Sequence, residues 1–404
     1  MVQQRTLLTT AEVARRLGVK RETVYAYVSR GLLDRHPESG HRASRFDAEA
    51  VERLAGRARR GDRSAALEVV IETQLTAIDP AGRISFRGQD ALSLARYRSF
   101  EDAAGLLWDG DPGAPWTLPD AERRLLAALR TALAPSRARP ADLIPVAVAA
   151  LAPGDPGRAD RRPEAVRRAG ARICAGALEM IDLAGGEAAG AGRRNAARRV
   201  WSALSGGRSA RPAQLSALDA ALVLLADHEL AASTLAARVA ASAWADPYRV
   251  VIAGLGPLGG ALHGGAPDTV HAMLAAIPSP EEAFGALESR RAAGAVLGFG
   301  HRVYTDRDPR ADHLLVRIPG VAVDPRAAAT VTNVLASARA LGLPAPNVDL
   351  ALAALAYVME LEPGAASTIF TVARIPGLIA HAIEEYPHRL RFRPRATYVG
   401  PAAR

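Results

Sequence analysis

Three histidines stand in segments that could do chemistry. His228 lies between two acids, Asp227 and Glu229. His263 lies in the glycine-rich stretch GPLGGALHGGAPDTV, and His301 follows a glycine in GFGHRVY. Glycine lets a backbone approach a ligand closely and leaves N–H groups free to bind anions. No two histidines have metal-site spacing next to acids, so we expect no metal. The structural alternatives are turn positions for His263 and His301, and for His228 a core position bonded to an adjacent acid.

One carboxylate and three arginines farther along the chain extend this set. Asp349 lies in PNVDLAL and Arg310 in DPRA, while Arg374 interrupts the apolar stretch FTVARIPGLIAHAIEE. Arg393 lies in RFRPRATYVG near the end of the chain. Burying the Arg374 guanidinium costs several kcal/mol unless a carboxylate pairs with it. The alternatives are a helix cap for Asp349, structural ion pairs for Arg310 and Arg374, and a surface cation for Arg393.

The composition favours closely packed helices in a reducing compartment. The chain has 404 residues, of which 49% are hydrophobic and only 5% aromatic, and alanine is abundant. This mixture favours helices over a β-sandwich. The single cysteine, Cys174, excludes an intramolecular disulfide. The first residues lack the apolar core of a signal peptide, and no run of about 18 apolar residues occurs. We therefore expect a cytoplasmic protein without a membrane span.

The basic charge is concentrated at the start of the chain. Of the net charge of +9, residues 1–63 contribute +6, since 14 Lys and Arg face 8 Asp and Glu there. Such a distribution suits a module that faces nucleic acid, attached to a nearly neutral body.

Residues 7–30 have the pattern of two short helices joined at a glycine. Thr9 and Glu12 form a capping-box pattern, Gly18 ends the first helix, and a turn between Leu33 and Phe46 predicts a small wing. Over about 55 residues this resembles the winged helix-turn-helix of the mercury-resistance-regulator and excisionase families. The resemblance implies DNA binding at residues 1–60, followed by a linker at 61–68; the alternative is a domain used only for packing. The side chains expected to face DNA are Lys20, Arg21, Thr23, Tyr25 and Tyr27.

The pattern of the chain changes after Val69. Branched residues around the turn Pro-Ala-Gly at 80–82 predict a short hairpin or an extended arm. Ser99 before two acids predicts the start of a helix. Residues 135–163 are rich in Pro, Gly and Arg, and we expect them to form a long surface connection. Most of the remaining chain has helical apolar periodicity.

Six motifs occur in an order that resembles the citrate synthase family. They are ADHELAASTLAARV, GALHGGAPDTV, GFGHRVY with DPRA, PNVD, FTVARIPGLIAH and RPRATYVG, between about residues 70 and 400. The resemblance implies a mainly all-α fold with a large domain at 69–255 and 360–404 and a small domain at 256–359. It also implies a homodimer whose active sites lie in the cleft between the domains.

The resemblance implies a role for each residue singled out above. Asp349 would remove a methyl proton from the acyl-CoA, His263 would stabilise the enolate oxygen, and His301 would polarise the oxaloacetate carbonyl. The side chains expected to hold the oxaloacetate carboxylates are His228, Arg310, Arg374 and, supplied by the second subunit, Arg393. The backbone expected to hold the adenine end of CoA is that of Ala295, Val296, Leu297, Gly298, Phe299 and Gly300.

These roles predict the condensation of acetyl-CoA or propionyl-CoA with oxaloacetate, which gives citrate or 2-methylcitrate and CoA. The thioester is then a co-substrate, and we expect no tightly bound cofactor. The two thioesters differ by one methylene, worth about 1–3 kcal/mol in a pocket, which leaves the choice between them open. Departures from the family pattern at Ala231, Thr305 and Leu350 keep a second interpretation open. In it, the chain is a metabolite-sensing transcriptional regulator whose body has weak or no activity.

Overall fold

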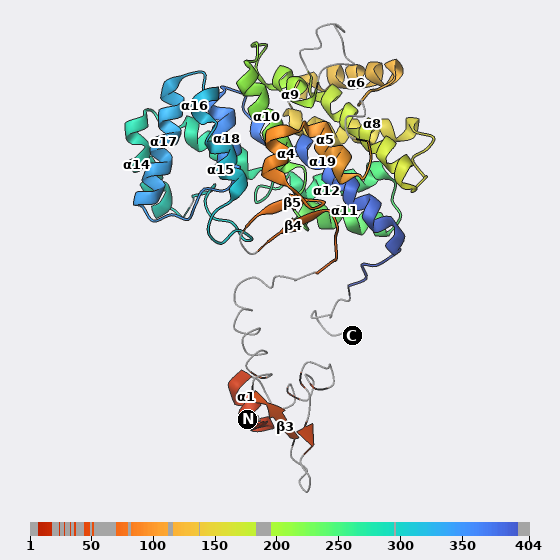
Figure 1. The fold of residues 1–404 in the computed structure, drawn as a ribbon, viewed down its shortest axis with the longest axis vertical. Helices are drawn as coiled ribbons and strands as arrows, with labels where there is room; N and C mark the ends of the chain where they lie inside the picture. Colours follow the sequence, from red (N-terminus) through yellow and green to blue (C-terminus); the bar gives the residue numbers. More distant parts are fainter. Residues whose placement is uncertain are drawn as a thin grey trace, which may run out of the picture. The chain divides into compact units, whose positions relative to one another are not determined.

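The computed structural model describes residues 7–17, 24, 28, 33, 36–37, 44–48, 51, 70–79, 82–111, 116–136, 138–182, 195–294 and 296–394. The chain forms two compact units, Met1–Glu72 and Thr73–Arg404 (Figure 1). We call the second unit the body. The further division of the body into a large and a small domain stays a prediction.

A small antiparallel sheet and a short helix make up the described part of the N-terminal unit. Its elements are β1 (Leu7–Thr9), α1 (Thr10–Leu17), β2 (His36–Pro37) and β3 (Ser44–Asp47), in the sheet order β1-β3-β2. The Glu12 N–H donates to Thr9 Oγ1 at 3.3 Å and the Thr9 N–H donates to Glu12 Oε2 at 2.7 Å, which confirms the predicted capping box. The β2–β3 pair lies where the wing was predicted. Lys20, Arg21, Thr23, Tyr25 and Tyr27 lie outside the described residues.

The body is mainly helical, as predicted. Its strands are β4 (Thr76–Ile78), β5 (Ile84–Phe86) and β6 (Gln89–Asp90). Its α-helices are α4 (Ala91–Tyr97), α5 (Phe100–Leu107), α6 (Asp120–Leu133), α7 (Pro140–Leu151), α8 (Pro163–Ile181), α9 (Ala196–Leu204), α10 (Pro212–Leu225), α11 (Ala232–Ser242), α12 (Pro247–Leu258), α13 (Ala266–Ala275), α14 (Ala283–Ala292), α15 (Pro309–Leu315), α16 (Ile318–Val321), α17 (Pro325–Ala340), α18 (Val348–Val358) and α19 (Ala365–Glu385). Short 3-10 turns occur at Ala134–Ser136, Ala152–Gly154, Pro280–Glu282 and Tyr386–His388.

Local signals explain the start of the body. β4 and β5 pair antiparallel, with Thr76 opposite Phe86 and Ile78 opposite Ile84, which confirms the predicted hairpin. Ser99 caps α5: its Oγ accepts from the Asp102 N–H at 3.1 Å, and the Asp102 carboxylate accepts from the Ser99 N–H. The hairpin and the capped helix follow from their own sequences, as turn and cap residues allow.

The expectation of a long surface connection at 135–163 was wrong. Residues Pro140–Leu151 form the helix α7, which packs against α8. Proline is favourable at the first helical position, so Pro140 starts the helix and does not interrupt it. Leu143, Ala147 and Leu151 recur at helical spacing and are buried, which outweighs the high proline and glycine content of the segment.

α19 is the central helix of the body. It packs against α8, α10, α11 and α12 (Figure 1). The stretch Ala365–His388 is long and apolar enough to cross a membrane by length and composition, but 94% of its apolar window is buried inside the body. Its hydrophobicity is therefore that of a core helix, and it carries Arg374 into the interior.

Candidate active site

The loop that carries His301 is paired with the segment before α18. The Asn347 N–H donates to Gly298 O at 3.0 Å, and the Gly300 N–H donates to Ala345 O at 2.8 Å. The Asn347 side chain donates to Gly300 O at 2.9 Å. Gly298 and Gly300 have φ of +91° and +74°, a region that favours glycine. This pairing holds His301 close to the N-terminus of α18.

Asp349 lies in the first turn of α18 with its carboxylate free. Asn347 Oδ1 caps the helix, since it accepts from the Asp349 and Leu350 N–H groups at 3.0 and 3.2 Å. The alternative of Asp349 as the helix cap is therefore wrong. Among the described residues, none makes a hydrogen bond or ion pair to the Asp349 carboxylate. Burial raises the pKa of Asp349 to about 6, against the opposing effect of Arg310. The group is ionised at pH 7 and is more basic than an exposed aspartate.

His301 is held in one tautomer. Its Nδ1 accepts from the Val303 N–H at 3.0 Å, so the neutral ring carries its proton on Nε2. Burial, and then the Arg310 charge, lower the pKa of His301, which keeps the ring neutral at pH 7. Nε2 lies 3.5 Å from Arg310 Nη2. Two N–H donors that face each other in this way leave a place for an acceptor oxygen of a ligand.

Arg310 is fixed by a two-point ion pair with Asp308. Nε donates to Asp308 Oδ1 at 3.0 Å and Nη2 donates to Oδ2 at 2.9 Å, and both side chains are buried. The Val348 N–H also donates to Asp308 Oδ2 at 3.0 Å. The ion pair expected as the structural alternative is thus present. It holds the guanidinium beside His301 and against the ring of Tyr304, 5.2 Å from the ring centroid.

His228 joins this cluster through Tyr304. Its Nε2 lies 3.1 Å from Tyr304 Oη, and its ring centroid lies 5.3 Å from that of His301. Burial, with the charges of Arg310 and Arg374, lowers the pKa of His228 well below its usual range. The alternative of a core histidine bonded to an adjacent acid is wrong, because its side-chain partner is a tyrosine.

His263 contacts a second group of side chains. Its Nε2 is 2.9 Å from Ser233 Oγ, and its ring packs edge-on against Phe370 with 5.7 Å between centroids. Burial, with a smaller effect of Arg374, lowers the pKa of His263 to about 4. The ring is therefore neutral at pH 7. When the Ser233 hydroxyl donates to Nε2, the ring proton lies on Nδ1 and is free for a ligand.

Arg374 is buried without a carboxylate partner. Its Nε donates to Leu225 O at 2.9 Å, and its guanidinium lies 5.3 Å from the Phe370 ring centroid. Among the described residues, none accepts a hydrogen bond from Nη1, and no carboxylate lies within ion-pair distance. Burial lowers the pKa of Arg374 to about 10. The structural ion pair expected as an alternative is absent, and a buried cation with free N–H groups is suited to an anionic ligand.

Of the remaining predicted residues, Gly300 lies beside His301, and Arg393 makes no contact with this cluster among the described residues. Arg393 is exposed on the segment after α19, and Ala295 lies outside the described residues. Phe299 forms a β-bridge with Pro346, as part of the loop pairing described above. Gly300, in the predicted adenine-binding segment, lines a cavity together with His301.

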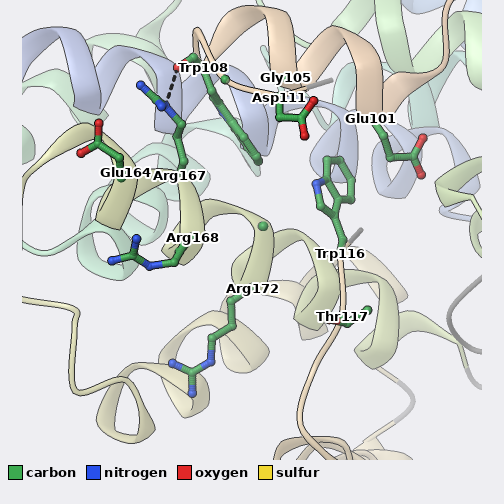
Figure 2. Close-up of a pocket in the computed structure, with 12 residues that line it drawn as sticks. Glu101, Gly105, Trp108, Asp111, Trp116, Thr117, Glu164, Arg167, Arg168 and Arg172 are labelled. Atoms are coloured by element: carbon green, nitrogen blue, oxygen red, sulfur yellow. Dashed lines mark hydrogen bonds between the residues drawn. The ribbon is translucent and has the colours of Figure 1, made fainter. Parts of the chain in front are cut away.

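The cavities in the described part of the body include one beside the predicted site and one away from it. One of about 340 Å³ opens beside His301, and its lining includes Tyr304, Asp308 and Asn347. The other, of about 510 Å³, lies between α5 and α8 and contains none of the predicted site residues (Figure 2). There the Arg167 Nε donates to Trp108 O at 2.9 Å, as Figure 2 shows. Of these two cavities, the smaller one is the one lined by predicted site residues. No group of three or more His, Cys, Asp or Glu side chains within the described ranges could hold a metal ion.

Comparison with known proteins matches the citrate synthase C-terminal domain over residues 66–395 and a helix-turn-helix domain over residues 7–59. The chain belongs to the citrate synthase family. A 2-methylcitrate synthase of Mycobacterium tuberculosis is 30% identical over 350 residues, which cover 82% of this chain and 88% of that protein. Citrate synthase 2 of Bacillus subtilis is 36% identical over 202 residues, which cover 48% of this chain and about half (54%) of that protein.

A solved structure also resembles the chain. It is the ternary complex of carboxymethyl coenzyme A and oxaloacetate with the citrate synthase of Thermoplasma acidophilum. The TM-score is 0.67 and the identity 25%, over 85% of this chain and 97% of that one. Membership of the citrate synthase family therefore rests on both the sequence and the fold.

Sequence reasoning missed several side chains that complete the citrate synthase-like site. Tyr304, Asp308 and Ser233 each contact one of the predicted residues. Asp308 could have been found, because an acid two residues before a buried arginine is a plausible partner. Tyr304 lies three residues after His301, and their ring centroids are 4.9 Å apart, so its closeness to His301 could also have been found. Its contact with His228, 76 residues away, and the contact of Ser233 with His263, 30 residues away, had no local signal.

Proposed function

We propose that the chain condenses an acyl-CoA with oxaloacetate, and that the products are citrate or 2-methylcitrate and free CoA. The observation that carries the proposal is the buried, unpaired guanidinium of Arg374 near two neutral histidines. A dicarboxylic keto acid supplies the negative charge that this cation lacks. The names of the similar proteins and the bound molecules of the Thermoplasma complex support the same substrate classes.

The chemistry follows from the protonation states of the side chains. The Asp349 carboxylate takes a proton from the carbon next to the thioester carbonyl, and the His263 N–H stabilises the enolate oxygen. The enolate carbon attacks the keto carbon of oxaloacetate. The His301 Nε2–H donates a hydrogen bond to the keto oxygen as negative charge develops there. This oxygen becomes the hydroxyl of the product with a net gain of one proton, which balances the proton that Asp349 removed and later releases. Water then cleaves the thioester and releases the CoA thiol and a carboxylate.

The test measures thiol release by the purified full chain. With oxaloacetate and either acetyl-CoA or propionyl-CoA, we expect release that depends on both substrates, and the ratio of kcat/KM values identifies the preferred thioester. Asp349→Ala is the matched control, because it removes the base and leaves the Asn347 cap in place. Turnover no greater than that of the control with either thioester would overturn the proposal.

We also propose that the active unit is a cytoplasmic homodimer in which Arg393 reaches the site of the second subunit. The exposure of Arg393 at the end of the described body supports a role outside its own site. Asp349→Ala and Arg393→Ala should each be nearly inactive, and mixing them after unfolding and refolding should restore roughly a quarter of wild-type activity. Half of the dimers are then mixed, and each mixed dimer holds one intact site. No recovery in refolded mixtures would place Arg393 outside the shared site.

A second function is favoured by the helix-turn-helix match at residues 7–59. In it, the N-terminal unit binds DNA and the body senses oxaloacetate or a CoA thioester. The full chain should bind duplex DNA, with affinity that falls about 10³-fold or more between 50 and 200 mM salt for six or more phosphate contacts. Binding should also change when oxaloacetate is added. The double variant Lys20→Ala and Arg21→Ala should abolish DNA binding. DNA binding whose affinity changes neither with salt nor in this variant would contradict the regulator function.

A further inference from the structure

Two opposite charges lie buried near one another without forming an ion pair. Arg374 Nη1 and Asp227 Oδ1 are both buried, and neither makes a hydrogen bond among the described residues. Asp227 Oδ1 lies 3.3 Å from His381 Nε2. Each charge nevertheless acts on the other, since Arg374 is among the groups that lower the pKa of Asp227. A buried guanidinium and a buried carboxylate with free atoms gain strongly from direct contact. Something in the structure must therefore keep these two apart.

Asp227 is restrained from two sides. The Thr76 hydroxyl on β4 donates to Asp227 Oδ2. His381 Nε2 on α19 lies 3.3 Å from each of the two carboxylate oxygens. The α19 backbone also lies close to the carboxylate at Gly377, where an added Cβ would lie 2.6 Å from Asp227 Oδ1. These contacts hold the carboxylate in a fixed orientation.

Arg238 sets the tautomer of His381. Arg238 Nη1 lies 2.9 Å from His381 Nδ1, and an arginine can only donate, so Nδ1 accepts and the ring proton lies on Nε2, toward Asp227. The Arg238 charge is balanced by Glu384 and Glu385, whose oxygens lie 2.6 and 2.8 Å from its nitrogens. Arg238, His381 and Thr76 thus form a restraint on Asp227 that touches no predicted substrate position.

We propose that Thr76, His381 and Arg238 are positioning residues that hold the Asp227 carboxylate away from Arg374, so that the Arg374 N–H groups stay open for a carboxylate of oxaloacetate. This inference rests on the proposed function. When the restraint is weakened, Asp227 turns to pair with Arg374 and competes with the substrate. Asp227 is thereby both the charge that makes a buried Arg374 tolerable and the competitor that must be restrained.

The test uses the full chain and the dissociation constant of oxaloacetate, measured by calorimetry. Thr76→Val keeps the shape and removes the hydroxyl, and it should weaken binding about tenfold, the effect of losing one hydrogen bond to a charged group. Thr76→Ser keeps the hydroxyl and should stay within about twofold of the wild type. The KM for acyl-CoA should not change with either variant, which separates positioning from general damage to the fold.

A double-mutant cycle tests the competition directly. Asp227→Asn removes the competing charge, so its oxaloacetate affinity should be no weaker than that of the wild type. Adding Thr76→Val to Asp227→Asn should then have almost no effect, because an asparagine cannot form the ion pair. A structural role for Thr76 would instead weaken binding in both backgrounds. His381→Leu, which removes the second restraint, should behave as Thr76→Val does and serves if that variant does not fold.

The outcomes separate this inference from the proposed function. A folded wild type that does not bind oxaloacetate overturns the proposed function and the inference with it. If the wild type binds oxaloacetate, two results overturn the inference alone. One is a Thr76→Val affinity for oxaloacetate within twofold of the wild-type affinity. The other is a Thr76→Val effect that is as large in the Asp227→Asn background as in the wild type.

Discussion

Replacing Arg374 with methionine should make the body more stable and abolish oxaloacetate binding. Methionine fills a similar linear space with an apolar side chain. In the native protein the guanidinium is buried, and its one hydrogen bond to the described residues runs from Nε to Leu225 O. The buried charge of Arg374 therefore lowers the free energy of unfolding of the substrate-free protein. A bound carboxylate of oxaloacetate would offset this loss by pairing with the guanidinium.

The magnitude follows from the pKa of Arg374, which burial lowers to about 10. At about 1.36 kcal/mol for each pKa unit, the difference from the ordinary guanidinium value is on the order of 3 kcal/mol. Loss of the hydrogen bond leaves Leu225 O unpaired, which reduces this gain in the free energy of unfolding by about 1 kcal/mol. The net expectation is a free energy of unfolding larger by about 2 kcal/mol, or a Tm higher by roughly 3 °C for a body of this size.

Chemical and thermal unfolding of the substrate-free full chain measure the stability, and calorimetry measures oxaloacetate binding. Affinity should fall by about 100-fold or more, since two charge-assisted hydrogen bonds are lost. Arg238→Met is the matched control, because this equally buried arginine is paired with Glu384 and Glu385. Its removal should lower the free energy of unfolding by roughly 3–5 kcal/mol. An Arg374→Met protein that is less stable than the wild type, or that binds oxaloacetate normally, would refute the reasoning.

Three further outcomes are expected. The kcat/KM for acyl-CoA should fall tenfold for each pH unit below about 6, because burial raises the pKa of Asp349 to about 6 and the carboxylate is protonated below that pH. A pH–rate profile checks this. A flat profile between pH 5 and 7 would exclude Asp349 as the base. For the same reason the Asp349 contribution to stability should decline as pH rises from 4 to 6, since the folded state holds the proton more tightly than the unfolded one. Gly298→Ala should lower the free energy of unfolding by about 1–3 kcal/mol, because φ is +91° and the new Cβ would lie 3.1 Å from Leu350 Cβ. The control Gly285→Ala on α14, where nothing lies within 4 Å, should be neutral or stabilising by up to about 1 kcal/mol, so equal losses for the two would contradict the steric argument.

Features that depend on neighbouring residues were predictable from the sequence. The capping box of Thr9 and Glu12 and the hairpin centred on residues 80–82 both form as their patterns indicate. The closeness of His301 and Arg310 was also foreseeable, because they are only nine positions apart in the sequence. In each case the decisive contacts lie within a short stretch of chain, so composition and spacing contain the needed information.

Features that depend on packing between distant segments were not predictable. The sequence suggested that a buried Arg374 needs a carboxylate partner, yet the nearby Asp227 is turned toward Thr76 and His381. That orientation depends on β4 and α19, 151 and 154 residues from Asp227. The helix α7 was missed for a related reason, because burial of its apolar face against α8 outweighs a local content of proline and glycine.

The backbone pairing between the segments 298–300 and 345–347 joins the two segments that carry the proposed carbonyl-polarising histidine, His301, and the proposed base, Asp349, into one rigid unit. Asp349 and His301 are 48 residues apart in the sequence but are linked through three hydrogen bonds of their supporting segments. Their spacing is then independent of the side chains that select the acyl group. Substitutions that adapt the pocket to a longer or shorter thioester can accumulate elsewhere in the body while the proton-transfer geometry is inherited unchanged.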